Sequence, residues 1–136
     1  NTGIHNVAIG SKSILNNTSG GYNTALGYKS LHDNTTGEYN VALGYLAGES
    51  NYTGNYNILI GSNINAYNNS VSNQLNIGNT IYGTGIYQST YKIGIGVASP
   101  EEVLDVRGNF QIKQSSAAVV VSPFPIGCAL RCSYKE

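Results

Sequence analysis

The chain has little of what most enzymes and nucleic-acid-binding proteins need. Only 10% of its 136 residues are charged, and seven Lys and Arg residues balance seven Asp and Glu residues, so the formal net charge is zero. A protein that binds nucleic acid needs a basic patch that neutralises phosphates. The low and balanced charge therefore argues against nucleic acid as a partner.

Long apolar runs are also missing, and so are Met and Trp. No run approaches the roughly 20 residues that cross a bilayer, so we expect no membrane insertion. The N-terminus shows no signal-peptide pattern, and the absence of Met even there indicates a processed product or an excised fragment. We expect either a targeting sequence outside these residues or another route out of the cell, such as release of virus particles.

Residues that could form a catalytic or metal site are few and poorly spaced. His5 and His32 lack a spacing suited to one metal ion. Glu101 and Glu102 are adjacent, and adjacent carboxylates do not converge on one substrate as a glycosidase pair does. No serine stands in a nucleophile-elbow sequence. We therefore predict no catalytic residues, no bound metal and no cofactor, and we expect that this chain is not an enzyme.

Glycine and tyrosine, by contrast, are abundant at 17 and 11 residues, and they recur in a fixed order. The phrase Asn-Thr-Ala-Leu-Gly at 23–27 occurs four times in close variants, and a degenerate copy follows at 75–78. Its closing glycines are each 17 residues apart: Gly10, Gly27, Gly44, Gly61 and Gly78. A fixed period without insertions is the signature of a repeat architecture. A disordered linker rich in Gly and Asn has no reason to keep aliphatic residues in phase.

One repeat unit favours strands over a helix. Gly recurs too often for a helix interior, whereas the phrase around Ala25 fits a short strand of about four residues. The stretch near Ser30 and Leu31 fits a second strand, and Gly, Asn and Thr between them supply turn chemistry. The constant period predicts an all-β fold, a parallel β-solenoid of 17-residue coils that rise by about 4.8 Å each.

Identical residues stack in such a solenoid, and stacked Asn side chains can bond one another. We therefore expect two Asn ladders. One consists of Asn6, Asn23, Asn40 and Asn57, and the other of Asn17, Asn34, Asn51 and Asn68.

The strand phrase is apolar on both of its faces. Ala8, Ala25, Ala42 and Leu59 share one face and suit a narrow lumen, which places the larger aliphatic residues outside. An apolar stripe along a monomer is an aggregation hazard. We predict that copies of the same chain bury it in a closed symmetric oligomer. The predicted interface residues of the solenoid are Val7, Ile9, Leu26, Val41, Leu43, Ile58 and Ile60.

The repeat resembles the head repeats of trimeric autotransporter adhesins. It is closer still to the Asn-Thr-Ala-Leu-Gly-Tyr repeats of phage, large-virus and bacterial fibre proteins, and this resemblance covers residues 1–79. A second segment, 92–109, reads Lys-Ile-Gly-Ile-Gly-Val-Ala-Ser-Pro-Glu-Glu-Val-Leu-Asp-Val-Arg-Gly-Asn. It looks like a segment of phage tail fibres that often precedes a trimeric stem, and its residues 97–99 differ from the usual residues of that segment.

These resemblances imply a homotrimeric fibre with three parts. The 17-residue-repeat solenoid covers 1–79, an intertwined trimeric β stem covers 80–113, and a tip or coupling segment covers 114–136. In the stem, Val103, Leu104 and Val106 would pack at the trimer axis.

The tyrosines of the repeat have two interpretations. Tyr22, Tyr39 and Tyr56 form one column, and Tyr28 and Tyr45 form another. Stacked tyrosines shield the turns of a solenoid, which is a structural role. Tyrosine also gives contact area at low entropy cost, so the first column is a candidate surface for a glycan or protein receptor.

Two kinds of covalent modification stay open. Four sequons are either glycan acceptors or a turn composition that repeats; they begin at Asn17, Asn34, Asn51 and Asn68. Cys128 and Cys132 either form a disulfide, which is plausible outside the cell, or remain free buried thiols. Without a nearby His they cannot close a zinc site.

The sequence as a whole predicts a structural and adhesive fibre module of a virion or cell surface. An extracellular homotrimer would support or make attachment to a receptor. The alternative is a subunit of an extracellular filament that polymerises end to end through solenoid ends and residues 115–136. A third interpretation is a carbohydrate-processing tail spike whose active site lies in other sequence.

Overall fold

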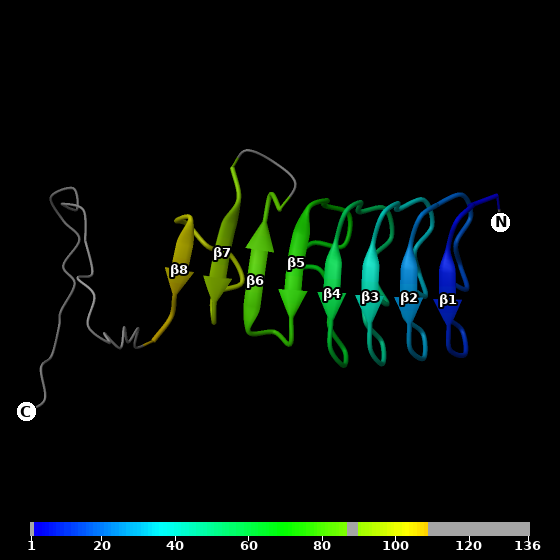
Figure 1. The fold of residues 1–136 in the computed structure, drawn as a ribbon, viewed down its shortest axis with the longest axis horizontal. Coiled ribbons are helices and arrows are strands. Elements are labelled where there is room, and N and C mark those ends of the chain that lie inside the picture. The colour runs from blue at the N-terminus through cyan, green and yellow to red at the C-terminus, as the bar shows by residue number, and fades with distance from the viewer. Residues whose placement is uncertain (1, 87–89, 109–136) are drawn as a thin grey trace, which may run out of the picture.

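The computed structural model describes residues 2–86 and 90–108, whose strands form one sheet of eight (Figure 1). The strands lie side by side in chain order. Their bounds are β1 Val7–Ile9, β2 Thr24–Leu26, β3 Val41–Leu43, β4 Ile58–Ile60, β5 Gln74–Ile77, β6 Ile81–Thr84, β7 Lys92–Ile95 and β8 Leu104–Val106. The predicted all-β fold is confirmed over these residues.

β1 to β5 form the parallel β-solenoid that the repeat predicts, with about four turns. Each strand pairs in parallel with the next one at an offset of 17 residues, as Val7 pairs with Thr24 and Ile58 with Leu75. The loops stack as regularly as the strands (Figure 1). The exact period of the sequence is therefore the length of one physical coil.

The second strand expected near Ser30 and Leu31 is wrong, because this segment is a turn. Lys29 and Leu31 have φ angles of 53° and 50°, which no strand contains. Their backbone groups nevertheless bond from coil to coil: Lys29 N–H donates to the Ser11 carbonyl at 3.0 Å and Leu31 N–H to the Ala47 carbonyl at 2.9 Å. The segment thus satisfies its hydrogen bonds without strand geometry.

The glycine that closes each strand phrase is required by close approach of the coils. Gly27 and Gly44 have φ angles of 139° and 132°, in a region that side chains rarely adopt. A Cβ built on Gly44 would lie 2.3 Å from the Gly61 carbonyl oxygen of the next coil. Any side chain here would push two coils apart.

The lumen of the solenoid is narrow and filled by small or aliphatic side chains. Ala25, Ala42 and Leu59 are fully buried, as the alternation of the strand phrase predicts, whereas Ala8 of the first coil is exposed. Leu31 reaches the lumen from the turn, although its backbone is not extended. The buried apolar residues form one cluster: Ile14, Ala25, Leu31, Ala42, Ala47, Leu59, Ile64 and Ala66.

The first predicted Asn ladder is confirmed, and it bonds mainly to the backbone. The side-chain oxygen of Asn23 accepts the backbone N–H of Asn40, one coil further on, at 2.9 Å. Asn40 does the same for Asn57, and Asn57 for Gln74, each at 2.9 Å. The side-chain nitrogen of Asn40 also donates to the Gly54 carbonyl at 2.8 Å. One side-chain amide therefore pairs with one backbone N–H through its oxygen and with one backbone carbonyl through its nitrogen.

The second ladder is shorter than predicted. Asn17, Asn34 and Asn51 are buried, and the Asn34 side-chain nitrogen donates to the Asn17 side-chain oxygen at 3.0 Å. The side-chain oxygen of Asn34 is buried and has no hydrogen-bond partner among the described residues. Asn68 is exposed, so the column ends one coil early.

The sheet changes direction after β5. β5, β6 and β7 pair antiparallel, and β8 then pairs parallel to β7. The described part of the predicted stem therefore continues the solenoid sheet within one chain, and the intertwining of three chains stays a prediction. Residues 109–136, including Cys128, Cys132 and most of the predicted tip, lie outside the described residues.

Replacing Asn40 by Ala should lower the unfolding free energy by about 2–4 kcal/mol. The Asn57 N–H would lose its partner inside the coil, at about 1–3 kcal/mol. The Gly54 carbonyl would keep only the longer bond from the Asn51 side chain, at 3.2 Å, and lose about 1 kcal/mol more. Asn6→Ala removes the equivalent pair of bonds in the half-buried first coil and should cost clearly less. Denaturant unfolding monitored by circular dichroism measures both. Equal losses would contradict a dominant role for the buried ladder.

Replacing Gly44 by Ala should disrupt the stacking of coils, because the new Cβ would clash with the Gly61 backbone. Gly78→Ala is the matched control: Gly78 closes the last copy of the phrase, and a Cβ there meets no atom within 4 Å. Its φ of 60° should cost only about 1 kcal/mol. Thermal unfolding should show a far lower Tm for the first variant, and similar Tm values would refute the steric explanation.

Candidate functional site: the outer face of the sheet

The outer face of the solenoid carries two aliphatic columns. Successive residues of a strand point to opposite sides, so the residues that flank the buried lumen positions point outward. One column begins at Val7 and the other at Ile9, and these side chains are 49% and 58% exposed. Leu26 is 47% exposed, whereas its neighbour Ala25 is fully buried. The further members from the predicted interface, Val41, Leu43, Ile58 and Ile60, are half-buried.

Strand pairing carries both columns through the change of direction. Directly paired residues lie on the same side of a sheet, so the pairing of β5 to β8 identifies the outward positions there. The first column continues as Leu75, Gly83, Ile93 and Leu104, and the second as Ile77, Ile81, Ile95 and Val106. The two predicted interface sets therefore belong to one face. Val103 is exposed but stands one residue before β8, outside both columns.

This face, which we call the outer apolar face, has no charged residue. Each strand gives one residue to each column, and only Thr24 and Gly83 are not aliphatic. With a strand spacing of about 4.8 Å, eight strands make the face about 34 Å long. A continuous apolar stripe of this length on the surface of a protein marks an interaction site.

The predicted tyrosine column is a stack of parallel rings. Tyr22 and Tyr39 lie 4.8 Å apart between ring centroids with planes 4° apart, and Tyr39 and Tyr56 lie 4.9 Å apart with planes 1° apart. His5 extends the stack at 4.8 Å from Tyr22. We call these four residues the entry column, because each stands two residues before the outward residue that opens a strand. Their φ angles of 57–58° are left-handed, a conformation that costs about 1–2 kcal/mol per residue.

A second stack follows the strands. Tyr28 and Tyr45, which we call the exit column, lie 5.6 Å apart with planes 13° apart. Each stands two residues after the last outward residue of its strand. The outer apolar face is thus bordered along the chain by aromatic residues before and after the strands. Burial by its neighbours, followed by the electrostatic effect of Tyr22 and Tyr56, raises the pKa of Tyr39.

The sequon asparagines differ in their exposure. The side-chain nitrogens of Asn17, Asn34 and Asn51 lie inside the coil and donate to glycine carbonyls three residues on, at 2.7, 3.0 and 3.2 Å. A glycan on these nitrogens would have no room in the folded coil. Asn68 alone is exposed. This placement favours the interpretation of the sequons as repeated turn composition.

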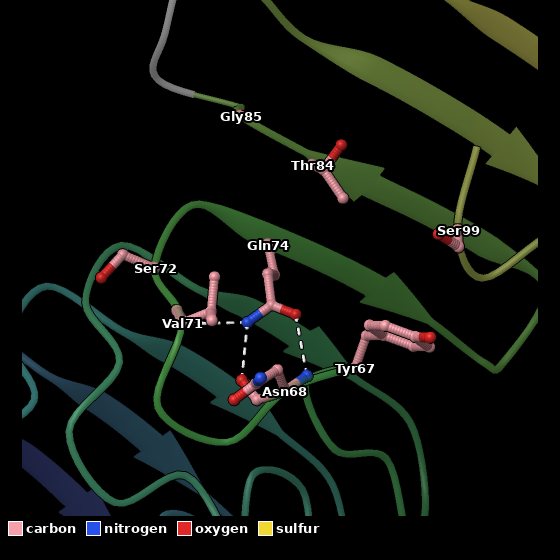
Figure 2. Close-up of a pocket in the computed structure, with 8 residues that line it drawn as sticks. All are labelled: Tyr67, Asn68, Val71, Ser72, Gln74, Thr84, Gly85 and Ser99. Atoms are coloured by element: carbon pink, nitrogen blue, oxygen red, sulfur yellow. Dashed lines mark hydrogen bonds between the residues drawn. The ribbon is translucent and has the colours of Figure 1, made fainter. Parts of the chain in front are cut away.

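An open hollow of about 410 Å³ lies where the last coil meets the antiparallel strands (Figure 2). The Gln74 side-chain nitrogen donates to the Asn68 and Val71 carbonyls at 2.8 and 2.7 Å, and its oxygen accepts the Asn68 N–H at 3.1 Å. Tyr67, Thr84 and Ser99 contribute to the rim (Figure 2). The described residues that line the hollow are uncharged, and the Gln74 amide is used by the fold itself.

Two pairs of ionisable side chains are in contact within the described residues. Lys29 Nζ lies 2.8 Å from a Glu49 carboxylate oxygen, and this hydrogen bond raises the pKa of Lys29. His32 Nδ1 contacts a carboxylate oxygen of Asp33 at 2.6 Å. Within 2–86 and 90–108, no three His, Cys, Asp or Glu residues are placed to share a metal ion. The same ranges contain no helix that is long and apolar enough to span a bilayer.

Comparison with protein-family models, with curated proteins and with solved structures gave no match to this chain. The assignment of a function therefore depends on the surface itself. Sequence reasoning identified the solenoid half of the outer apolar face but missed Leu75, Ile77, Ile81, Ile93 and Ile95 as members of it. The Gly-Asn pair at 78–79, between two alternating segments, was the signal for the hairpin that brings them there.

Replacing Tyr39 by Ala should lower the unfolding free energy by about 1–3 kcal/mol, because it removes two ring contacts worth about 0.5–1.5 kcal/mol each. Tyr39→Phe keeps the stack and should be nearly neutral. Tyr52→Ala is the matched control, since Tyr52 is as exposed as Tyr39 but belongs to neither column. Chemical denaturation of the three variants measures these unfolding free energies. A large loss of unfolding free energy in Tyr39→Phe would show that the hydroxyl, and not the stacked ring, stabilises the fold.

Proposed function

We propose that this chain is a homotrimeric module of an extracellular fibre, which holds or forms a receptor-attachment element of a virion or cell surface. The observation that carries the proposal is the outer apolar face. It runs without a charged residue over all eight described strands, and an exposed apolar stripe of this kind marks an interaction surface.

Copies of the same chain are the partner that fits this face best. Its aliphatic residues repeat at the strand spacing, so a second copy placed parallel presents the same repeat at the same height. Closed symmetry is the usual result of self-association in proteins. The resemblance of the repeats to those of trimeric fibre proteins favours three chains, and three copies of one module would give avidity for a receptor.

The elongated shape of the fold supports a role as a spacer. Each coil adds about 4.8 Å of length, and the coils are joined by backbone pairing and Asn bonds at every step. Such a rod resists bending because its hydrogen bonds run along its axis. A stiff rod that places a receptor-binding element away from a surface needs no catalytic residue.

An end-to-end filament is the second candidate, and one observation favours it. β1 has no strand on its outer side in the described sheet, and all three of its residues are exposed. A free edge can pair with another strand. The corresponding edge of β5 is covered by β6, so stacking of solenoid ends would have to use a different edge of the second subunit.

Light scattering at several dilutions tests the proposal. We expect a mass of three chains at every dilution for the native protein, and a single-chain mass for Leu43→Glu, which buries a charge in the interface. Thr36→Glu, at an exposed turn position, is the control and should keep the native mass. A native protein that is monomeric at all dilutions would refute the trimer, and a mass that climbs with concentration would favour the filament.

A further inference from the structure

We infer that the two tyrosine columns are the lateral contact between neighbouring subunits, with the entry column of one chain packed against the exit column of the next. This inference rests on the proposed self-association through the outer apolar face. It assigns to Tyr22, Tyr39 and Tyr56 a protein partner, the same chain, instead of an external receptor.

The first argument is the size of the face. Two columns on strands of three residues make a strip about 10 Å wide and about 34 Å long, or about 350 Å². A stable interface buries about 800 Å² on each partner. The entry tyrosine and the exit tyrosine of one coil are six residues apart. A strip that includes both is therefore at most about 20 Å wide. The tyrosine columns flank β1 to β4 on one side and β2 and β3 on the other, so including them brings the strip closer to the size of a stable interface than the aliphatic columns alone.

The second argument is the chemistry of the border. Protein interfaces have an apolar centre and a polar rim, and they are enriched in Tyr. Tyrosine suits a border because its ring is apolar and its hydroxyl stays satisfied by water or a partner. The rings here are already ordered by stacking at 4.8–4.9 Å. Little side-chain entropy is then lost on association.

The third argument concerns which part of each ring is free. Both faces of the Tyr39 ring are covered, by Tyr22 on one side and Tyr56 on the other. The exposed part of Tyr39, 41% of the residue, therefore presents ring edges rather than a ring face. A sugar that stacks on an aromatic ring needs an open face. A row of edges fits against a second row of side chains with the same spacing.

The fourth argument is symmetry. The entry and exit columns stand at opposite ends of the strands. When copies are arranged parallel around an axis along the rod, the entry side of each chain meets the exit side of its neighbour. Tyr39 and Tyr45 flank the same strand, β3, and therefore lie in the same coil.

Thiol cross-linking tests the inference in the full chain with Cys128→Ser and Cys132→Ser as background. The test variant carries Tyr39→Cys with Tyr45→Cys and is treated with a short bismaleimide. This reagent is preferable to oxidation because two contacting tyrosines hold their Cα atoms farther apart than a disulfide spans. We expect covalent trimers on a denaturing gel. Each single variant should stay monomeric on that gel, since like columns do not meet.

Two further variants secure the result. Tyr22→Cys with Tyr28→Cys flanks β2 and should give the same covalent trimers, so misfolding at one coil does not decide the outcome. Tyr39→Cys with Tyr67→Cys is the negative control, because Tyr67 is well exposed but lies at the hollow instead of the border. Trimers from this control as abundant as those from the test variant would overturn the inference.

Light scattering of the uncross-linked samples separates the inference from the proposed function. A mass of three chains without cross-links in both double variants would refute the tyrosine contact and leave the trimer intact. Covalent dimers as the end product, with a mass of two chains, would support the entry-to-exit contact and refute the trimer. Cross-linking of the single Tyr39→Cys variant would overturn the inference, because such a cross-link forms only when the entry columns of two chains meet each other.

Discussion

The bond from an asparagine side-chain oxygen to the backbone N–H one coil further on is the interaction on which the rest of the structure depends. It recurs at 2.9 Å from Asn6 through Gln74 and stands at the start of β2, β3, β4 and β5. A single inserted residue would move the next asparagine off its partner and turn the strand residues to the wrong side. The constant period of 17 residues in the sequence follows from this geometry, because each bond joins residues that are 17 positions apart.

A second constraint follows from the first. Coils held this close leave a lumen that is already filled by one residue of each strand, such as Ala42, and by turn residues such as Leu31. Aliphatic residues that strands favour, such as Val41 and Leu43, must then stand on the outside. The outer apolar face is therefore a direct result of a narrow coil built from strand-forming residues. The self-association that we propose follows from the same local rule that forms the coil.

Much of the fold followed from the sequence because the repeat reports both period and phase. Positions such as Ala25 and Asn40 were placed correctly because alternation and stacking are local rules. The turn at Leu31 was missed, since an aliphatic residue at φ 50° violates the backbone preference on which such reasoning depends. The left-handed tyrosines were missed for the same reason. The continuation of the outer apolar face depended on a hairpin register, which no repeat specifies.

Stability and association are linked in a solenoid of this size. Each coil orders 17 residues but buries only a few aliphatic side chains, and ordering costs about 1.5 kcal/mol per residue. Backbone pairing and the Asn bonds offset part of that cost. The remaining apolar surface lies outside the coil, on the outer apolar face and its tyrosine borders. In the proposed assembly, covering that surface would contribute both to folding and to association, so substitutions such as Leu43→Glu should weaken the two together.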